Sequence, residues 1–370
     1  MQIKPFRIEH YFGKYEFTTR YLLSSSDAES RTVQELLDLE PGAQECLLKQ
    51  RCGYTESPGG PALRQAISGI YRGIKPEHVL AVSAAEEGIF VFYHALVGPG
   101  DHVIVEIPCY ESALEVARST GAQISEWPRR YEDGWVHDLA ALEKMIQPNT
   151  KIIYINTPHN PTGLLMPANV LQHVMKLASS RGILVFCDEV YRELEHDPAN
   201  RLPAACEIYE RAVSLGSMSK SYGLPGLRLG WLVCKDAELL ARCLEFKYYT
   251  TICSSAPSEI LTAVALRHRE VLAQRNREIV LRNLPLLDSF FRQRANLFEW
   301  IKPNAGPIGF VHFKPQRDVF LFCEDVARKA GVLLLPGTVY DQPHHIRFGY
   351  GRKNMPEALA HLSAYLDAQA

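Results

Sequence analysis

The sequence predicts an α/β protein whose large domain is a mostly parallel β-sheet covered by helices on both faces. Short apolar runs of strand length recur at 79–83, 102–107, 151–156 and 182–188. Segments with helical apolar spacing lie between such runs, at 139–146 and 167–181. Because parallel strands need a crossover connection, this alternation favours a three-layer domain. Ligands of such domains gather at the carboxyl ends of the strands.

The composition is that of an ordinary globular protein. Its 370 residues are 46% hydrophobic and 22% charged, with a formal net charge of -2. There is no basic excess, which argues against nucleic-acid binding. The apolar runs are too short to cross a bilayer, so we expect no membrane association. Residues 1–21 contain no uninterrupted apolar core, and we therefore expect no signal peptide and a cytoplasmic location.

Cysteine and histidine do not form a metal-binding pattern. The nine cysteines are odd in number and include no C-x-x-C pair, so we interpret them as reduced thiols, several of them in buried strands. His344 and His345 are adjacent, and nothing in the sequence completes a ligand set around them. We expect no metal site.

The segment 214–231 contains the most informative lysine of the chain. Lys220 follows Ser217 and Ser219 and precedes a Gly/Pro-rich turn that ends at Arg228. A lysine amine can condense with the aldehyde of pyridoxal phosphate, while hydroxyl and guanidinium groups can donate to its phosphate. In isolation, a Ser-x-Ser-Lys sequence is more often a polar turn, so the neighbouring motifs decide its meaning.

Two upstream segments support a cofactor site. The strand at 151–156 leads into Asn160 within Asn-Pro-Thr-Gly, and the apolar run from 182 delivers Asp188 and then Tyr191. In the order Asn160, Asp188, Tyr191, Lys220, Arg228, these residues resemble the aspartate aminotransferase superfamily, the class I/II pyridoxal-phosphate enzymes of fold type I. The resemblance implies that fold, with a smaller α+β domain after the large one, and pyridoxal 5'-phosphate as the cofactor.

The resemblance also implies roles around the cofactor ring. Lys220 would form the Schiff base, and Asp188 would keep the pyridine nitrogen protonated so that the ring withdraws electrons from the substrate carbon. Asn160 and Tyr191 would hydrogen-bond the phenolic oxygen. Tyr110 would stack on the face of the ring.

A phosphate loop is expected where the strand at 79–83 enters a helix. The free N–H groups and positive dipole of a helix start bind anions. The resembled family has a Gly-Ala-Gln-like tripeptide here, whereas this chain has Ala84, Ala85 and Glu86. A carboxylate at Glu86 would repel phosphate unless it points away or pairs with a cation. We keep these three residues as cofactor-binding candidates, together with Ser217, Ser219 and Arg228.

Three further candidates concern the substrate and the second subunit. By resemblance, Arg347 grips the substrate α-carboxylate, with Asn160 and Ser26 beside the substrate. The alternative for Arg347 is a surface arginine on an edge strand. Tyr54 would reach the cofactor phosphate of a neighbouring subunit, which implies a homodimer with active sites at the interface.

The resemblance divides the chain into three parts. Residues 1–40 form an arm that packs on the small domain, 41–245 the large cofactor-binding domain, and 246–370 the small domain. We expect a capping residue at Ser30 or Thr32 and one long helix over 259–287 that links the two domains. Its arginines are expected on a solvated face, namely Arg275, Arg277 and Arg282.

The predicted activity is that of an aminotransferase that moves an amino group between an L-amino acid and a 2-oxo acid. The alternative is a lyase, a decarboxylase or an amino-acid cyclase resembling capreomycidine synthase. The loop at 24–30, which departs from the usual Gly-rich sequence, and Glu86 both favour keeping that alternative. A non-catalytic sensor domain is disfavoured because no DNA-binding segment accompanies this domain.

Overall fold

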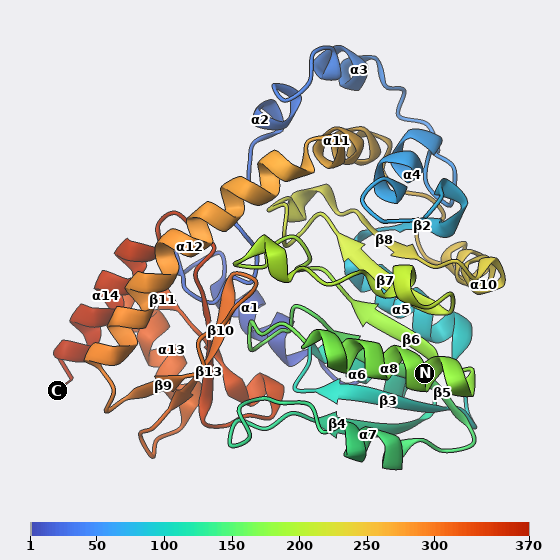
Figure 1. Ribbon diagram of the computed structural model, residues 1–370. Coiled ribbons are helices and arrows are strands. Elements are labelled where there is room, and N and C mark those ends of the chain that lie inside the picture. The colour runs from blue at the N-terminus through green and yellow to red at the C-terminus, as the bar shows by residue number, and fades with distance from the viewer. Residues whose placement is uncertain (1, 370) are drawn as a thin grey trace.

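The computed structural model describes residues 2–369 and contains a large and a small sheet (Figure 1). The strands of the large sheet are β2 (Val79–Val82), β3 (His102–Ile107), β4 (Gln123–Pro128), β5 (Thr150–Asn156), β6 (Leu184–Asp188), β7 (Ala212–Ser217) and β8 (Gly230–Val233). Their order is β2-β8-β7-β6-β5-β3-β4. β8 runs antiparallel to both its neighbours, and all other pairs are parallel. This confirms the predicted mostly parallel sheet.

Helices cover both faces of the large sheet, and strand alternation explains why. In β5, Ile152 and Tyr154 pack into one hydrophobic core while Ile153 and Ile155 pack into another. The first core includes α5 (Ala84–Leu96), α6 (Glu111–Ser119) and α10 (Ala237–Lys247). The second includes α7 (Leu139–Met145), α8 (Ala168–Arg181) and α9 (Ala205–Ile208). A third core joins α4 (Pro61–Ser68) to α11 (Ala256–Arg267).

The small sheet has the order β12-β13-β10-β9 and lies at the other end of the molecule (Figure 1). Its strands are β9 (Phe298–Trp300), β10 (Ile308–Phe313), β12 (Leu335–Pro336) and β13 (His345–Gly349). Its core includes residues of α12 (Arg269–Gln293), α13 (Val319–Ala330) and α14 (Met355–Asp367). A separate parallel pair joins β1 (Tyr21–Leu22) to β11 (Val332–Leu333).

The N-terminal helix α1 (Arg7–Tyr15) belongs to the core of the small sheet. Ile8, Tyr11 and Tyr15 are buried there with residues such as Phe310. Next come α2 (Val33–Leu37) and α3 (Ala43–Lys49). Thr32 caps α2 through a capping box with Glu35, which confirms one of the two predicted caps.

The predicted single helix over 259–287 is wrong. α11 ends at Arg267, and His268 leaves the helical conformation at φ -110° and ψ 21° before α12 begins. The prediction of a solvated face holds for exposed Arg282. It does not hold for Arg275, which is half-buried and donates to the Glu29 carbonyl at 2.7 Å, or for Arg277, which is also half-buried.

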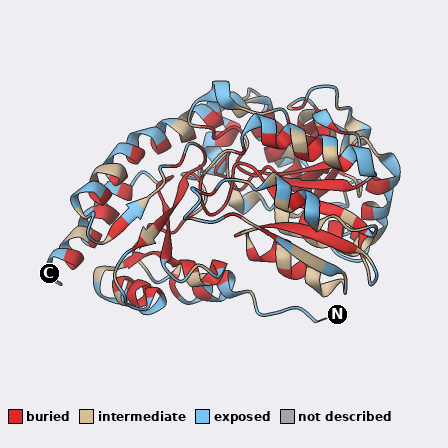
Figure 2. Cartoon of the chain, turned by 60° about the horizontal axis from the view of Figure 1, so that its bottom comes forward, coloured by how far each residue is buried: buried red, intermediate tan, exposed pale blue. Residues whose placement is uncertain are grey.

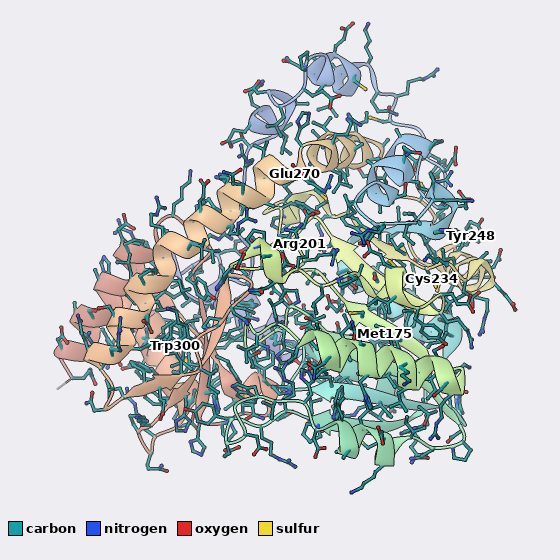
Figure 3. The ribbon with its side chains drawn as sticks, viewed as in Figure 1. Met175, Arg201, Cys234, Tyr248, Glu270 and Trp300 are labelled. Carbon is teal, nitrogen blue, oxygen red and sulfur yellow. The ribbon has the colours of Figure 1, made fainter. Side chains whose placement is uncertain are left out.

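Burial is concentrated in the strands and in the helix faces turned toward them (Figure 2). Side chains fill the space between helices and sheets, and Met175 on α8 and Cys234 after β8 are among the buried ones (Figure 3). Within residues 2–369, no helix has both the length and the apolar character required to cross a membrane.

Candidate active site

The candidate residues meet at the carboxyl edge of the large sheet. Asp188 ends β6, Ser217 ends β7, and Asn160 follows β5 in the loop after Asn156. Because β5, β6 and β7 are adjacent and parallel, their ends lie together, and Asn156 pairs directly with Asp188. The turn after β7 brings Lys220 to the same edge, where the negative charge of Asp188 raises the pKa of its amine.

Asp188 is a buried carboxylate that accepts only two hydrogen bonds from the described residues, one of them long. It is 5% exposed, accepts the Val190 N–H at 3.1 Å and is 3.4 Å from the Tyr154 hydroxyl. Burial raises the pKa of Asp188 to about 6, and these bonds and Lys220 only partly oppose that rise. A cationic ligand group beside Asp188 would therefore hold it ionised.

Lys220 is half-buried, and its amine points into the site. Its Nζ donates to the Ser26 hydroxyl oxygen at 2.8 Å. Burial lowers the pKa of Lys220, with Arg347 acting in the same direction and Asp27 opposing it. A lysine with a lowered pKa retains more of the neutral amine that nucleophilic and base chemistry require.

Arg347 lies in the centre of the small sheet, next to Asn160. β13 pairs with β12 on one side and β10 on the other, so the edge-strand alternative is wrong, and Arg347 is only 1% exposed. Its Nη1 donates to Asn160 Oδ1 at 3.2 Å and to the Tyr340 hydroxyl, while Nη2 donates to the Ser24 carbonyl at 2.9 Å. Arg347 Nε has no hydrogen-bond partner among residues 2–369.

Tyr191 supplies a second unsatisfied polar group. Its side chain is 1% exposed, and within the described chain its hydroxyl completes no hydrogen bond of normal geometry, although the Ser26 side chain lies near enough to lower its pKa. Burial raises the pKa of Tyr191, so the phenol stays neutral and can both donate and accept. Buried hydroxyls normally have partners, and a ligand at this edge of the sheet would provide one.

The start of α5 forms a backbone cradle. Ala84 has φ 65°, a left-handed conformation that glycine adopts more easily than alanine. Gly230 in β8 leaves room for this turn, because a Cβ there would lie 2.8 Å from the Ala84 carbonyl carbon. The first N–H groups of α5, including that of Ala85, therefore approach the sheet edge without an obstructing side chain.

Polar side chains surround this cradle, and Glu86 is the unusual one. Glu86 accepts a hydrogen bond from the Ser112 hydroxyl at 3.2 Å, and burial raises the pKa of Glu86 to about 7. Arg228 is exposed, with φ 47°, and donates to the Pro225 carbonyl at 3.1 Å. The Ser217 hydroxyl accepts the Ser219 N–H at 3.3 Å.

Of the two aromatic residues predicted near the cofactor, Tyr110 is packed against α1 and Tyr54 is exposed. The Tyr110 hydroxyl donates to Glu9 of α1 at 2.8 Å, and its ring lies 5.2 Å from that of Phe6. Tyr54, by contrast, is 91% exposed, and its own chain does not enclose it.

The sequence prediction missed several residues that hold this arrangement together. Tyr340 bonds both Asn160 and Arg347, and Tyr154 approaches Asp188. Tyr154 was detectable because it interrupts the three isoleucines of β5 with a hydroxyl group, but Tyr340 carries no comparable signal. Glu9 could be recognised only once α1 was placed against Tyr110.

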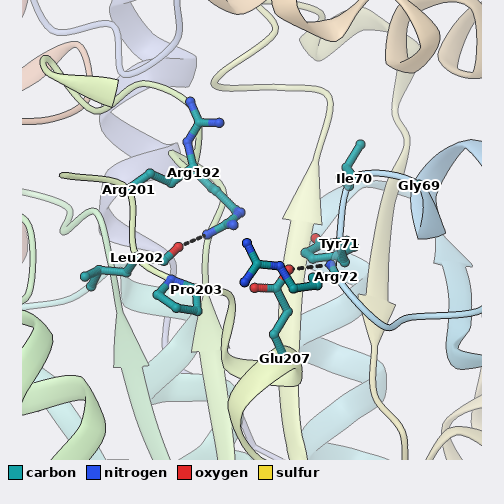
Figure 4. Close-up of a pocket in the computed structure, with 9 residues that line it drawn as sticks. All are labelled: Gly69, Ile70, Tyr71, Arg72, Arg192, Arg201, Leu202, Pro203 and Glu207. Atoms are coloured by element: carbon teal, nitrogen blue, oxygen red, sulfur yellow. Dashed lines mark hydrogen bonds between the residues drawn. The ribbon is translucent and has the colours of Figure 1, made fainter. Parts of the chain in front are cut away.

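A hollow of about 420 Å³ lies elsewhere on the large domain (Figure 4). It is lined by Gly69, Ile70, Tyr71, Arg72, Arg192, Arg201, Leu202, Pro203 and Glu207, and it includes none of the predicted site residues.

Comparison with known proteins decides the family. The family model described as aminotransferase class I and II matches residues 23–362, which include every candidate named above. The chain belongs to the aminotransferase class I and II family. Enzymes of this family depend on pyridoxal phosphate, and this chain is accordingly a pyridoxal-phosphate-dependent enzyme of fold type I.

Individual relatives span nearly the whole length of this aminotransferase-family chain. Capreomycidine synthase of Streptomyces vinaceus is 28% identical over 377 residues, which cover 98% of this chain and 94% of the relative. A pyridoxal-phosphate-dependent aminotransferase from Streptococcus suis superposes with a TM-score of 0.94 at 30% identity, covering 100% and 99%. The pyridoxal-phosphate-dependent cyclase OrfR superposes with a TM-score of 0.93 at 27% identity, with the same coverage.

The geometry of this family member fits the cofactor. The half-buried Lys220 amine, the buried Asp188 carboxylate and the buried Tyr191 hydroxyl, which completes no hydrogen bond within residues 2–369, meet at one sheet edge, beside a cradle of backbone N–H groups that a side chain at Gly230 would fill. Those groups match an aldehyde, a pyridine nitrogen, a phenolic oxygen and a phosphate, respectively.

Proposed function

We propose that this enzyme is an aminotransferase that carries an amino group from an L-amino acid to a 2-oxo acid. The observation that carries the proposal is a set of three groups at the sheet edge, namely the half-buried Lys220 amine, the buried Asp188 carboxyl near it, and the buried Arg347 fork hydrogen-bonded to Asn160. The first two suit a pyridoxal-phosphate ring, and the third suits the α-carboxylate of an amino acid.

Each end of the cofactor has candidate partners in this proposal. Lys220 would bind the aldehyde carbon covalently, Asp188 the pyridine nitrogen, and Asn160 and Tyr191 the phenolic oxygen, with Tyr110 against the ring. The phosphate would accept hydrogen bonds from the backbone N–H groups of Ala84 and Ala85 and from the side chains of Ser217, Ser219 and Arg228, and Glu86 would lie beside it and donate only when its carboxyl group is protonated. When bound, the cofactor supplies an electron sink that makes the substrate Cα proton removable.

The remaining chemistry belongs to side chains of this protein. Arg347 binds the α-carboxylate and so fixes the substrate Cα. The Lys220 amine, with its lowered pKa, takes the Cα proton on Nζ and can return it to a neighbouring carbon. Asp188 retains the proton on the pyridine nitrogen, because a carboxylate that cannot be solvated is stabilised by a cation beside it.

We further propose that the active unit is a cytoplasmic homodimer. Tyr54 is almost fully exposed in the single chain, which suits a residue that reaches the phosphate site of a second copy. The domains are proposed to be the arm 1–40, the cofactor-binding domain 41–245 and the small domain 246–370, with the substrate between the last two.

The second candidate is an amino-acid cyclase on the same fold. It is favoured by the similarity to capreomycidine synthase over 98% of the chain and to the cyclase OrfR. The two candidates share the proton removal by Lys220 and differ in products. Transamination yields one 2-oxo acid for each amino group transferred, whereas cyclisation yields no oxo acid.

The experiment is a product assay on the purified holoenzyme with a panel of amino acids and 2-oxo acids. Stoichiometric oxo acid that appears with the aminated acceptor supports the aminotransferase. Loss of the amino acid to a cyclic product, or to ammonia, with no aminated acceptor would replace it by the cyclase or lyase. Arg282→Lys, on the exposed face of α12, is the control variant and should fold and react like the native protein.

A further inference from the structure

The loop that carries Ser26 is tied firmly to the small sheet. The Ser24 carbonyl accepts Arg347 Nη2 at 2.9 Å, and Asp27 holds Arg352 through both carboxylate oxygens at 2.9 Å. Gly349 of β13 lies so close that a Cβ there would fall 1.9 Å from the Ser25 carbonyl oxygen. The backbone that carries Ser26 is therefore held in place on both sides of that residue.

This hydroxyl touches the most reactive group of the site. Ser26 Oγ accepts a hydrogen bond from Lys220 Nζ at 2.8 Å, although the two residues are 194 positions apart in the chain. A second contact joins the same segments, because the Ala28 N–H donates to the Lys220 carbonyl at 3.4 Å. Ser26 also lies close enough to Tyr191 to lower the pKa of that phenol.

A hydroxyl acceptor has a defined effect on a lysine base. A neutral amine that donates one N–H to Ser26 keeps its lone pair available for a proton, with its direction fixed by the bond. Without that acceptor, the four-carbon side chain of Lys220 can rotate, and the lone pair samples unproductive directions.

We propose that Ser26 is a positioning residue for Lys220, whose hydroxyl holds the Nζ amine whenever that amine is not bonded to the cofactor. This rests on the proposed function, because it assumes that the lysine alternates between bound and free states. Ser26 and Arg347 would then have different roles. Arg347 would bind the substrate, whereas Ser26 would act only through the Lys220 base.

The pKa of Lys220 provides a direct readout. The groups that face its amine are Asp27, Glu9 and Asp188, which raise the pKa, and Arg347, which lowers it. A hydroxyl oxygen stabilises an ammonium more than an amine, so removing Ser26 lowers the pKa of Lys220. A hydrogen bond to a charged group corresponds to a shift of about one pKa unit.

The first test uses the full chain after removal of the cofactor. The rate of reductive methylation of Lys220 is followed by mass spectrometry of its peptide across pH for the native protein, Ser26→Ala, Ser26→Thr and Ser25→Ala. We expect the pH at which the methylation rate is half-maximal to fall by about one pH unit in Ser26→Ala alone. Ser26→Thr should restore the native value. An unchanged inflection in Ser26→Ala, or an equal shift in Ser25→Ala, would overturn the proposal.

The second test uses the holoenzyme and separates positioning from substrate binding. We expect Ser26→Ala to slow exchange of the substrate Cα proton with solvent deuterium about tenfold, with KM for the amino acid nearly unchanged. A raised KM with native kcat would assign Ser26 to substrate binding instead. If the native protein shows no lysine-dependent cofactor absorption, the proposed function fails. The methylation test would still decide whether Ser26 holds the Lys220 amine, because it uses protein without cofactor.

Discussion

Single residues carry the strongest argument for a ligand at the sheet edge. Asp188 and Arg347 are 5% and 1% exposed, and neither forms an ion pair within 4 Å with another residue of 2–369. Burying an unpaired charge is costly unless another group compensates it. We infer that a cationic ring nitrogen compensates Asp188 and that a carboxylate compensates Arg347.

Arg347→Lys tests the second half of that inference. Lysine retains the charge but lacks the planar fork, so it cannot reproduce the two-nitrogen geometry in which Nη1 contacts Asn160 and Tyr340 while Nη2 contacts the Ser24 carbonyl. We expect KM for the amino acid to rise about 10- to 100-fold, with a smaller change in kcat. Arg282→Lys serves as the matched control, and native KM in Arg347→Lys would remove Arg347 from the substrate site.

Glu86 predicts a pH dependence of cofactor affinity. The pKa of Glu86 is raised to about 7, so the group is neutral below that pH and becomes an anion beside the proposed phosphate site above it. Affinity for pyridoxal phosphate should therefore fall about three- to tenfold from pH 6 to 8 relative to Glu86→Gln. Pyridoxal, which has no phosphate, is the control ligand. Parallel pH profiles for the native and Glu86→Gln proteins would place Glu86 away from the phosphate.

Sequence reasoning proposed the reactive residues but not the residues that contact them in the fold. Lys220, Asp188, Asn160 and Tyr191 were recognisable because their residue types and order are distinctive. Tyr340 and Tyr154 act by proximity, and proximity between residues far apart in the chain depends on how the small and large sheets pack. The role of Glu86 could be questioned from the sequence, but its raised pKa depends on burial that only the fold reveals.

At the scale of elements, contacts between segments distant in sequence determine the shape of the site. The loop at 24–27 packs on β13, and α1 contacts Tyr110, so the N-terminal arm completes the site. The strand and helix alternation was predictable from local periodicity. The break between α11 and α12 was not, because the helical spacing continues across His268.

Gly349→Ala tests the contact between β13 and this loop. The new methyl group would meet the Ser25 carbonyl at 1.9 Å, which forces the loop and Ser26 to move. We expect a loss of about 1–3 kcal/mol in the free energy of unfolding, measured by denaturant titration, together with slower turnover. Gly98→Ala has open space around its Cβ and should leave both quantities native. Equal behaviour of the two variants would show that the loop does not depend on this contact.

At the scale of the molecule, the large sheet carries the proposed cofactor site and the small sheet carries Arg347. The family motif made this architecture predictable, because the order of five residues identifies a fold of known layout. The position of Tyr54 relative to a second copy could not be derived from one chain. Its 91% exposure is the physical reason for the proposal that it reaches the site of a second copy.

Hybrid dimers test that assignment. Tyr54→Ala and Lys220→Ala are each expected to lower activity, the second almost completely. In randomly mixed 1:1 dimers, half of the molecules would combine an intact lysine of one chain with an intact tyrosine of the other at one site. About a quarter of all sites should then be native, and activity should rise above the mean of the two separate variants toward a quarter of the native value. Activity equal to the mean of the two separate variants would mean that each chain supplies its own Tyr54, or that Tyr54 has no such role.

The most direct measurement is the visible absorption spectrum of the purified protein with pyridoxal phosphate, alone and with amino acids, beside the Lys220→Ala variant. Our account predicts a cofactor band that depends on Lys220 and is converted by particular amino acids to the band of the aminated cofactor. A native protein without a lysine-dependent band would contradict the assignment of Lys220. A band that amino acids shift without producing aminated cofactor would contradict transamination and support the cyclase.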